Sequence, residues 1–230
     1  SITGSGGSDE IITTVTTTLT LFEEGGTTPI PGVRVDLLKA GGKGTGKRLN
    51  TEADGKVAFD VLNTFTHAFK VTMNGGSFTT GEDSGARSET VVAQLSTVTL
   101  IAESGVGIGG ARVDLLRADG KGTGKKTTTA GDGVAGFQVL PGSSHAFKVS
   151  LNGGSAVTEQ VVGEIDATMQ TALSTMTVTN HSGDGISGVR VDLMRADGKG
   201  TGKKLNTDAN GVSGFEILPE YAHAFKVSFH

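Results

Sequence analysis

The chain has 230 residues, with 24 acidic and 20 basic side chains and a formal net charge of −4 at pH 7. This weakly acidic balance does not predict nucleic acid as a partner, and the absence of cysteine excludes disulfides, thiolate catalysis and cysteine-held zinc or iron–sulfur centres. No apolar run approaches the roughly 20 residues that span a bilayer, so we expect no membrane span.

A fixed repeat organises the chain. The run Arg-Val-Asp-Leu-Leu/Met begins at Arg34, Arg112 and Arg190, and the run His-Ala-Phe-Lys-Val begins at His67, His145 and His223. Because 112 − 34 and 190 − 112 both equal 78, one step of 78 residues relates the copies. Nothing is inserted or deleted between the two runs in any copy. The sequence therefore predicts one structural unit used three times.

Within each copy the apolar residues alternate with a period of two. In the second copy, Thr97–Leu100 and Arg112–Leu116 alternate in this way, and two more strands are expected at 133–140 and 145–151. Asp-Gly or Asn-Gly dipeptides separate these segments and supply the positive φ that tight hairpins need. About seven short strands in each copy, with frequent turns, are typical of a small antiparallel sandwich.

A short motif carries a family resemblance. It reads Thr129-x-x-x-Gly133-x-x-x-Phe137-x-x-Leu140-Pro141, with Thr51, Gly55, Phe59 and Leu62 in the first copy and Thr207, Gly211, Phe215 and Leu218-Pro219 in the third. It resembles the prealbumin-like sandwich repeats of bacterial surface proteins, the Cna B-type and carboxypeptidase-regulatory-like domains. The resemblance implies an Ig-like or transthyretin-like sandwich with a stalk, spacer or filament role.

These observations predict an all-β chain of three tandem Ig-like or transthyretin-like antiparallel β-sandwich domains. The expected bounds are 19–95, 96–173 and 174–230, preceded by an N-terminal donor strand at 1–18. The junctions between copies contain neither Pro nor a Gly-rich spacer, so we expect a stiff rod. A start at Ser1 without Met favours export, and the expected location is the cell surface or the extracellular space.

The third copy stops early in the repeat. After the His-Ala-Phe-Lys-Val run, the first two copies continue through a hairpin and a further extended segment that the third copy lacks. We therefore expect the third sandwich to lack one or two strands, leaving an acceptor edge at Phe225, Val227 and Phe229. Residues 8–17 match the missing segment in register but have no earlier copy to join. The apolar residues assigned to this self-assembly strand are Ile11, Ile12, Val15 and Leu19.

The unmatched strand before the first copy and the missing strand in the third copy predict a homopolymer, in which the donor strand of one subunit enters the third domain of the next. The alternative is a stalk cut from a longer surface protein, or an adhesin segment that binds carbohydrate. An adhesin normally needs an exposed aromatic platform, and Tyr221 is the sole tyrosine in a chain without tryptophan. An accessory domain of a secreted enzyme is a third interpretation.

Local patterns do not predict an enzyme, and we expect no catalytic, cofactor or metal site. Gly41–Lys47 has the spacing of a phosphate-binding loop, but Arg48 replaces the Ser or Thr that would hold magnesium, which favours a hairpin loop. The three repeated histidines have no second ligand nearby and favour a structural role. Asp54, Asp132 and Asn210 each precede a glycine, as turn residues do.

The sequence contains candidate residues for an intramolecular amide bond and for glycosylation. The family resemblance implies a Lys-to-Asp or Lys-to-Asn amide, for which Lys70, Lys148 and Lys226 and Asp36, Asp114 and Asp192 are the candidates; the assisting acid does not recur, since that position reads Asp60, Gln138 and Glu216. An exposed ion pair is the alternative. Asn180-His181-Ser182 is the sole N-glycosylation sequon, and the Thr-rich segment 13–20 is a candidate for O-glycans.

Overall fold

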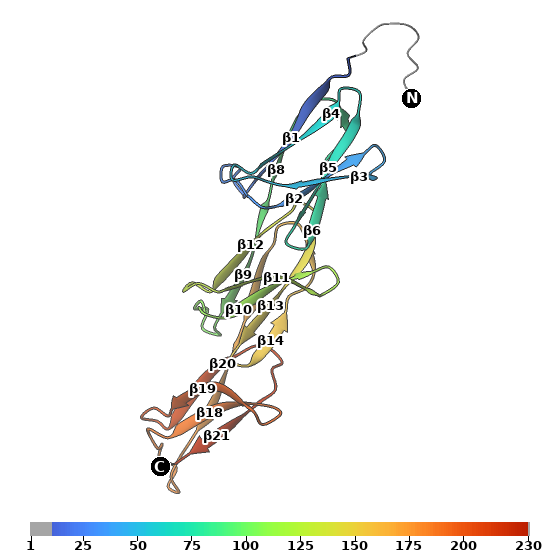
Figure 1. The fold of residues 1–230 in the computed structure, drawn as a ribbon. Helices are drawn as coiled ribbons and strands as arrows, with labels where there is room; N and C mark the ends of the chain where they lie inside the picture. Colours follow the sequence, from blue (N-terminus) through green and yellow to red (C-terminus); the bar gives the residue numbers. More distant parts are fainter. Residues whose placement is uncertain (1–10, 230) are drawn as a thin grey trace. The chain divides into compact units, whose positions relative to one another are not determined.

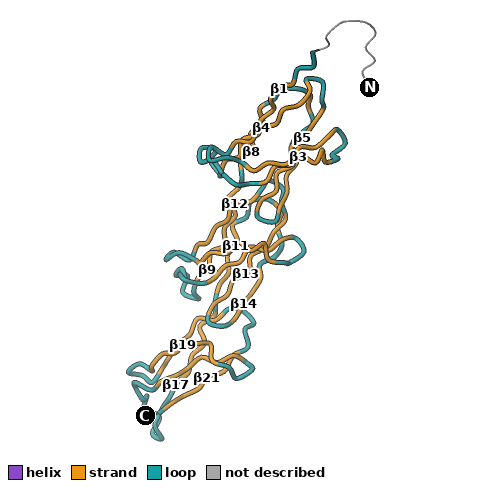
Figure 2. Tube along the Cα trace, viewed as in Figure 1, coloured by secondary structure: helices purple, strands orange, loops and turns teal. Residues whose placement is uncertain are grey.

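The computed structural model describes residues 11–229. Across that range the chain forms strands joined by turns and loops, and contains no helix (Figures 1 and 2). It divides into two compact units, one made of the residues up to Gln94 together with Gln138–Ser143, the other of Leu95–Phe137 together with the residues from Ser144 onward. The sheets come in pairs, one pair for each copy of the repeat.

The first repeat contains a small sheet with the order β4-β1-β8 and a large sheet with the order β3-β2-β5-β6, on which β7 also pairs with β5. Its strands are β1 (Thr14–Phe22), β2 (Arg34–Lys39), β3 (Gly44–Asn50), β4 (Lys56–Leu62), β5 (Thr66–Met73), β6 (Gly76–Thr79), β7 (Asp83–Ser84) and β8 (Ser88–Val92). β1 is antiparallel to β4 and parallel to β8.

The second repeat has the same pair of sheets, in the orders β12-β9-β16 and β11-β10-β13-β14, with β15 also on β13. Its strands are β9 (Gln94–Ile101), β10 (Arg112–Arg117), β11 (Gly122–Thr128), β12 (Val134–Val139), β13 (Ser144–Leu151), β14 (Gly154–Val157), β15 (Val161–Val162) and β16 (Asp166–Gln170). β16 is parallel to β9, as β8 is to β1. The sequence repeat is therefore also a repeat of topology.

The third repeat has fewer strands. Its small sheet contains only β17 and β20, and its large sheet has the order β19-β18-β21. The strands are β17 (Ala172–Thr177), β18 (Arg190–Arg195), β19 (Gly200–Asn206), β20 (Val212–Ile217) and β21 (His223–Ser228). Within the described residues, nothing in this repeat corresponds to β6, β7 and β8 or to β14, β15 and β16.

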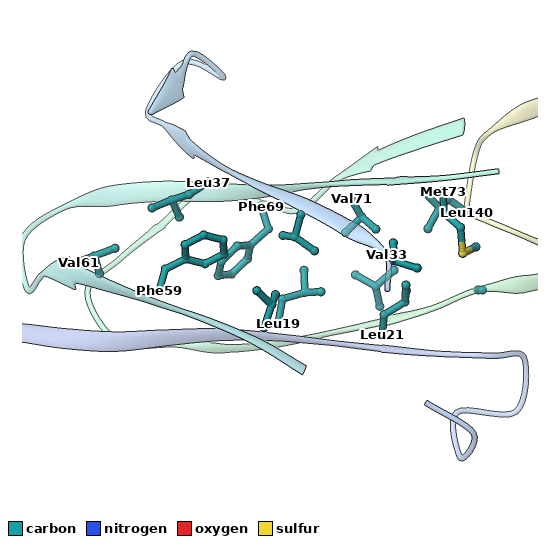
Figure 3. Close-up of a cluster of buried hydrophobic side chains, with 14 residues drawn as sticks. Leu19, Leu21, Val33, Leu37, Phe59, Val61, Phe69, Val71, Met73 and Leu140 are labelled. Carbon is teal, nitrogen blue, oxygen red and sulfur yellow. The ribbon is translucent and has the colours of Figure 1, made fainter. Parts of the chain in front are cut away.

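The core of the first repeat lies between its two sheets (Figure 3). Alternating residues of β4 point inward, so this strand shows a strict exposed–buried pattern from Lys56 to Leu62. Leu19 and Leu21 of β1 are fully buried. Phe59 and Phe69 face each other across the core with ring centroids 6.0 Å apart. Burying each such side chain stabilises the fold by about 1.5–3 kcal/mol.

The hairpin turns follow the sequence prediction. Asn152 has a φ of 49° and Gly153 a φ of 89°, and this pair joins β13 to β14. Asn74 and Gly75 repeat the arrangement between β5 and β6, with φ values of 49° and 84°. Positive φ at both central residues matches the twist of a two-residue hairpin, and Asn and Gly tolerate it best.

The all-β sandwich class is confirmed, but two details differ from the sequence analysis. One strand pair in the small sheet of each complete repeat is parallel, because the chain crosses from the large sheet back to the small one before β8 and β16. In addition, β1 begins at Thr14, so residues 14–18 of the predicted donor segment pair with β4 inside the first repeat. The first repeat therefore starts before residue 19.

Candidate functional site

The loop with phosphate-loop spacing is a β-hairpin. Gly41 and Gly42 form the exposed turn between β2 and β3, and Lys47 lies on β3, which pairs antiparallel with β2. A phosphate loop would need a helix after it, and β3 occupies that place. The predicted turn roles of Asp54 and Asp132 are also confirmed, because each carboxylate accepts a hydrogen bond from the backbone N–H two residues on.

The three histidines lie inside or at the edge of the cores. His67 Nε2 lies 2.9 Å from Thr17 Oγ1, and its Nδ1 lies 2.9 Å from the carbonyl oxygen of Phe65. Because a carbonyl only accepts, Nδ1–H donates to it and Nε2 accepts from the hydroxyl. His223 makes the same pair of contacts, with Ser174 and the carbonyl of Tyr221, and His145 Nε2 lies 2.7 Å from Ser96 Oγ. A structural role for each histidine follows.

We predict that Thr17→Val destabilises the first repeat by about 1–3 kcal/mol, because it leaves the buried Nε2 of His67 without a donor. The matched control is Thr18→Val, one residue along the same strand, where the hydroxyl bonds to Ser88 at the exposed surface. Denaturant unfolding followed by circular dichroism measures both. Equal losses of stability in the two variants would contradict this role of the hydroxyl.

The candidate amide residues face each other across strands. Asp36 is the partner of Lys70 in the register of β2 and β5, and the same register joins Asp192 to Lys226. The carboxylates, however, bond to an arginine two residues before them: Arg34 Nη2 lies 2.7 Å from Asp36 Oδ1. Arg190 does the same to Asp192 and lowers the pKa of that carboxyl. The ion pairs observed are thus Arg–Asp pairs within one strand, and Asp36 also lies 4.0 Å from Arg48 Nε on the neighbouring strand.

Two further sequence-predicted residues have defined places. Asn180 lies in an exposed turn, where its Nδ2 donates to Asp184 Oδ2 at 3.0 Å. Tyr221 stacks on His223 with ring centroids 6.1 Å apart and is half-buried against Gly154. It is therefore not an exposed aromatic platform of the kind that binds carbohydrate. No group of three or more metal-ligating side chains, and no membrane-crossing helix, occurs in the part of the chain that the structure describes.

The four residues assigned to the donor strand divide into two pairs. Val15 and Leu19 belong to β1, where they are partners of Val61 and Val57, and Leu19 is 0% exposed. Both therefore serve the core of their own repeat. Ile11 and Ile12 precede β1 and are 85% and 61% exposed. Residues 8–10 of the predicted strand lie outside the described residues.

The small sheet of the third repeat has a free edge at β17. In the first two repeats the equivalent strands, β1 and β9, are each covered by a parallel strand. Among the described strands, β17 pairs with β20 alone. Met176 and Val178 take the positions of Leu19 and Leu21, 157 residues earlier by the repeat register, yet both are half-exposed where their counterparts are fully buried. Where no parallel strand covers the small sheet, two apolar residues thus remain partly exposed, although their counterparts in the first repeat are buried.

The large sheet of the third repeat is open as well. β21 pairs with β18 on one side, and no described strand takes the place that β6 and β14 occupy beside β5 and β13. Phe225 and Val227 are only half-buried, whereas Phe69 and Val71, their counterparts in the first repeat, are 0% exposed. Phe229 follows β21 and is 66% exposed. Phe225, Val227 and Phe229 of the predicted acceptor edge thus lie on or directly after β21, and β17 offers a second free edge in the same repeat.

The complete repeats show what fills such a vacancy. β8 contributes Val91 and β16 contributes Met169, both buried, and the residues on either side of them are exposed. Val91 lies beside Leu21 and Met169 beside Leu100 in the parallel registers. A strand that completes this sheet therefore needs one large apolar side chain at the fourth of its five positions, with exposed residues on either side of it.

No protein-family model and no curated protein matches the chain. Among solved structures it is similar to the Bacillus anthracis TIE protein, with 14% identity and a TM-score of 0.29 over 94% of this chain and 45% of that one. It is also similar to BcpA, the major pilin subunit of Bacillus cereus, with 15% identity, a TM-score of 0.29 and coverage of 90% and 85%. A third is the shaft pilin spaA from Lactobacillus rhamnosus GG, with 11% identity, a TM-score of 0.31 and coverage of 70% and 98%. The chain thus spans less than half the length of the first of these proteins and most of the other two.

Proposed function

We propose that the chain is a structural subunit of an extracellular or cell-surface filament, assembled head-to-tail by donation of an N-terminal β-strand. The donor segment comprises residues 9–13 of one subunit, and it adds to β17 in the third repeat of the neighbouring subunit. The observation that carries the proposal is the free edge of β17, whose core-facing residues are uncovered although the two other repeats cover the same positions with a parallel strand.

The register of the repeat supports the assignment of the donor residues. Leu19 corresponds to Val98, an offset of 79, so residues 9–13 correspond to Ser88–Val92 of β8. Ile12 then takes the position of Val91, the buried residue of that strand, and Ile11 the position of the exposed Thr90. In the register of β8 on β1, Ile12 would lie beside Val178 of the acceptor.

The sequence of the donor fits the requirement of the vacancy. Asp9 and Glu10 precede the two isoleucines, as Asp166 begins β16 and Glu89 is the second residue of β8. Ile12 is 61% exposed in the subunit, so moving it into an apolar slot is favourable by about 1–2 kcal/mol, and five residues of new backbone pairing add to this. Such an interface is heterologous and propagates, because the donor and the acceptor lie at different places on the subunit.

The alternative is a stalk segment of a longer surface protein, in which a following segment of the same chain completes the third repeat. The free edge of β17 is equally compatible with it. Strand donation requires the 230-residue chain to self-associate through residues 9–13, whereas the stalk interpretation requires no self-association.

The test compares the 230-residue chain with a variant that lacks residues 1–13, both purified and viewed by electron microscopy. This deletion spares β1, which begins at Thr14. We expect filaments from the first and monomers from the second. Monomers from both would reject strand donation in favour of the stalk, and filaments from both would show that assembly uses another surface.

A further inference from the structure

One contact occurs twice along the chain at the same sequence separation. Asn74, in the β5–β6 turn, donates from Nδ2 to the backbone carbonyl of Gln138 at 2.7 Å. Asn152, in the β13–β14 turn, donates in the same way to the carbonyl of Glu216, also at 2.7 Å. In each case the hairpin of one repeat contacts the end of β12 or β20, a strand of the following repeat. The contact is thus part of the repeat pattern.

Apolar packing accompanies the first of these hydrogen bonds. Met73, the last residue of β5, and Leu140 belong to one buried cluster and lie next to each other in Figure 3. Leu218, the counterpart of Leu140 by the step of 78 residues, is also 0% exposed. Both leucines lie in repeats that follow a β5–β6 or β13–β14 hairpin, and both are buried.

The backbone of each hairpin also approaches the following repeat closely. A Cβ at Gly76 would lie 2.5 Å from Ser143 Cβ, and a Cβ at Gly154 would lie 2.7 Å from the ring of Tyr221. Both glycines are the first residue of the second hairpin strand, β6 or β14. Ser143 and Tyr221 are themselves counterparts in the repeat, so the same position receives the hairpin each time.

The first repeat presents the receiving half of this contact, and no described hairpin packs against it. Leu62 corresponds to Leu140 and Leu218, but it is 48% exposed. Phe65 corresponds to Ser143 and Tyr221, and it is half-buried. Leu62 and Phe65 border a pocket of about 330 Å³. No described residue covers Leu62 as Met73 covers Leu140. We call Leu62, Phe65 and the backbone carbonyl of Asp60 the docking surface.

The third repeat presents the other half. Phe229 corresponds to Met73 and Leu151, and it is 66% exposed. The position of Asn74 and Asn152 is taken in the third repeat by His230, which lies outside the described residues. Leu62 and Phe229, the two residues that the repeat pattern would bring together at a junction, are thus both apolar and exposed.

We infer that the docking surface of one subunit binds the end of β21 of a second copy of this chain, with Phe229 packed on Leu62. This inference rests on the proposed filament and assigns the second half of its subunit contact. The donor strand and the docking surface both belong to the first repeat, and β17 and β21 both belong to the third. A junction between two subunits then repeats two features of the chain itself. One is the parallel strand that completes a small sheet, and the other is the packing of a β-strand end against the following repeat.

Because the chain has no cysteine, the Leu62→Cys, Phe229→Cys double variant supplies the only two thiols. Under a mild oxidant we expect its filaments to yield a ladder of disulfide-linked multimers on a non-reducing gel. Each single variant should give dimers at most. The control is Met73→Cys, Leu140→Cys, which should close a bond within one chain, detected as the loss of two hydrogens from the intact mass.

The outcomes separate this inference from the proposed function. Filaments without a ladder, when the control pair closes, overturn the docking surface and leave strand donation standing. A ladder that persists when Ile12→Asp is added keeps the docking surface and rejects strand donation. The absence of both filaments and ladder overturns both proposals, because no second copy then reaches the surface.

Charge substitution provides a second readout. Leu62→Asp should raise the concentration needed for assembly about tenfold or more, because it removes apolar burial at the contact. The matched control is Leu49→Asp, at a residue of the same repeat with nearly the same exposure, 49% against 48%. An equal effect of the two substitutions, measured by sedimentation at a series of concentrations, would contradict the inference.

Discussion

Ile12→Asp abolishes filament formation while Ile11→Asp leaves it intact, if residues 9–13 add to β17 as proposed. The two side chains are neighbours, but in the register of β8 the first faces the core and the second faces solvent. A carboxylate at the buried position costs the apolar burial of isoleucine, about 1.5–3 kcal/mol, together with several kcal/mol for desolvating a charge. Both residues are exposed in the subunit, so neither change should alter its own stability.

The measurement is negative-stain electron microscopy at matched concentrations, with circular dichroism to confirm that both variants are folded. The comparison tests the alternation of the strand and not simply the presence of an apolar residue. Loss of filaments in both variants would indicate that the isoleucines act together as an apolar patch, without the strand register. Retention in both would exclude residues 11 and 12 from the interface.

Gly133→Ala destabilises the second repeat by about 3 kcal/mol or more, a large effect for the addition of one methyl group. A Cβ at this position would lie 2.2 Å from the carbonyl oxygen of Leu100, and φ is +85°. The backbone of β9 supplies that oxygen, so it cannot move aside without disturbing the sheet. Strain at positive φ adds a further 1–2 kcal/mol.

Gly120→Ala is the matched control. It has a similar φ of +76°, but no atom lies within 4 Å of the added Cβ. Its cost should be limited to the strain at positive φ, about 1–2 kcal/mol. Thermal unfolding followed by circular dichroism, with hydrogen exchange to locate the affected repeat, measures both variants. Similar losses would mean that the close approach to Leu100 relaxes freely, contrary to this prediction.

The position of Gly133 also explains part of the family-like motif. Gly55 and Gly211 take the same place in the other repeats, and a Cβ there would lie 2.4 Å from the carbonyl oxygen of Leu21 and 2.2 Å from that of Val178. A glycine is required at each because the loop after the small-sheet strand passes against the turn. The threonine of the motif also has a common role, since Thr129 Oγ1 accepts from the N–H of Ala111 and donates to the carbonyl of Ile108.

The sequence by itself determined the local structure and its repetition. Alternating residues predicted the strands, Asn-Gly and Asp-Gly predicted the tight turns, and the step of 78 residues predicted three equal units. The register also predicts that the third repeat lacks strands, and among the described residues β17 and β21 each pair on one side only; the expectation itself stays a prediction. These features depend on side-chain period and turn geometry, which neighbouring residues encode.

Only the tertiary structure decided which residues pair over long separations. The alternation of apolar residues runs on from Ile11 through Leu21, so nothing in the sequence marks Thr14 as the point where pairing with β4 begins. For the same reason Val15 and Leu19 look like donor residues in the sequence, although both pack in their own repeat. The parallel pairing of β8 was likewise hidden, because a strand carries the same period in either direction.

Two contacts on which the predictions depend join residues that lie far apart in sequence. Thr17 and His67 are 50 residues apart, and Asn74 and Gln138 are 64 apart. Each partner read alone is an ordinary strand or turn residue. The exposure of Leu62 against the burial of Leu140 has no local signal either, since both follow the same motif. Such differences arise from what covers a residue, and the fold alone determines that.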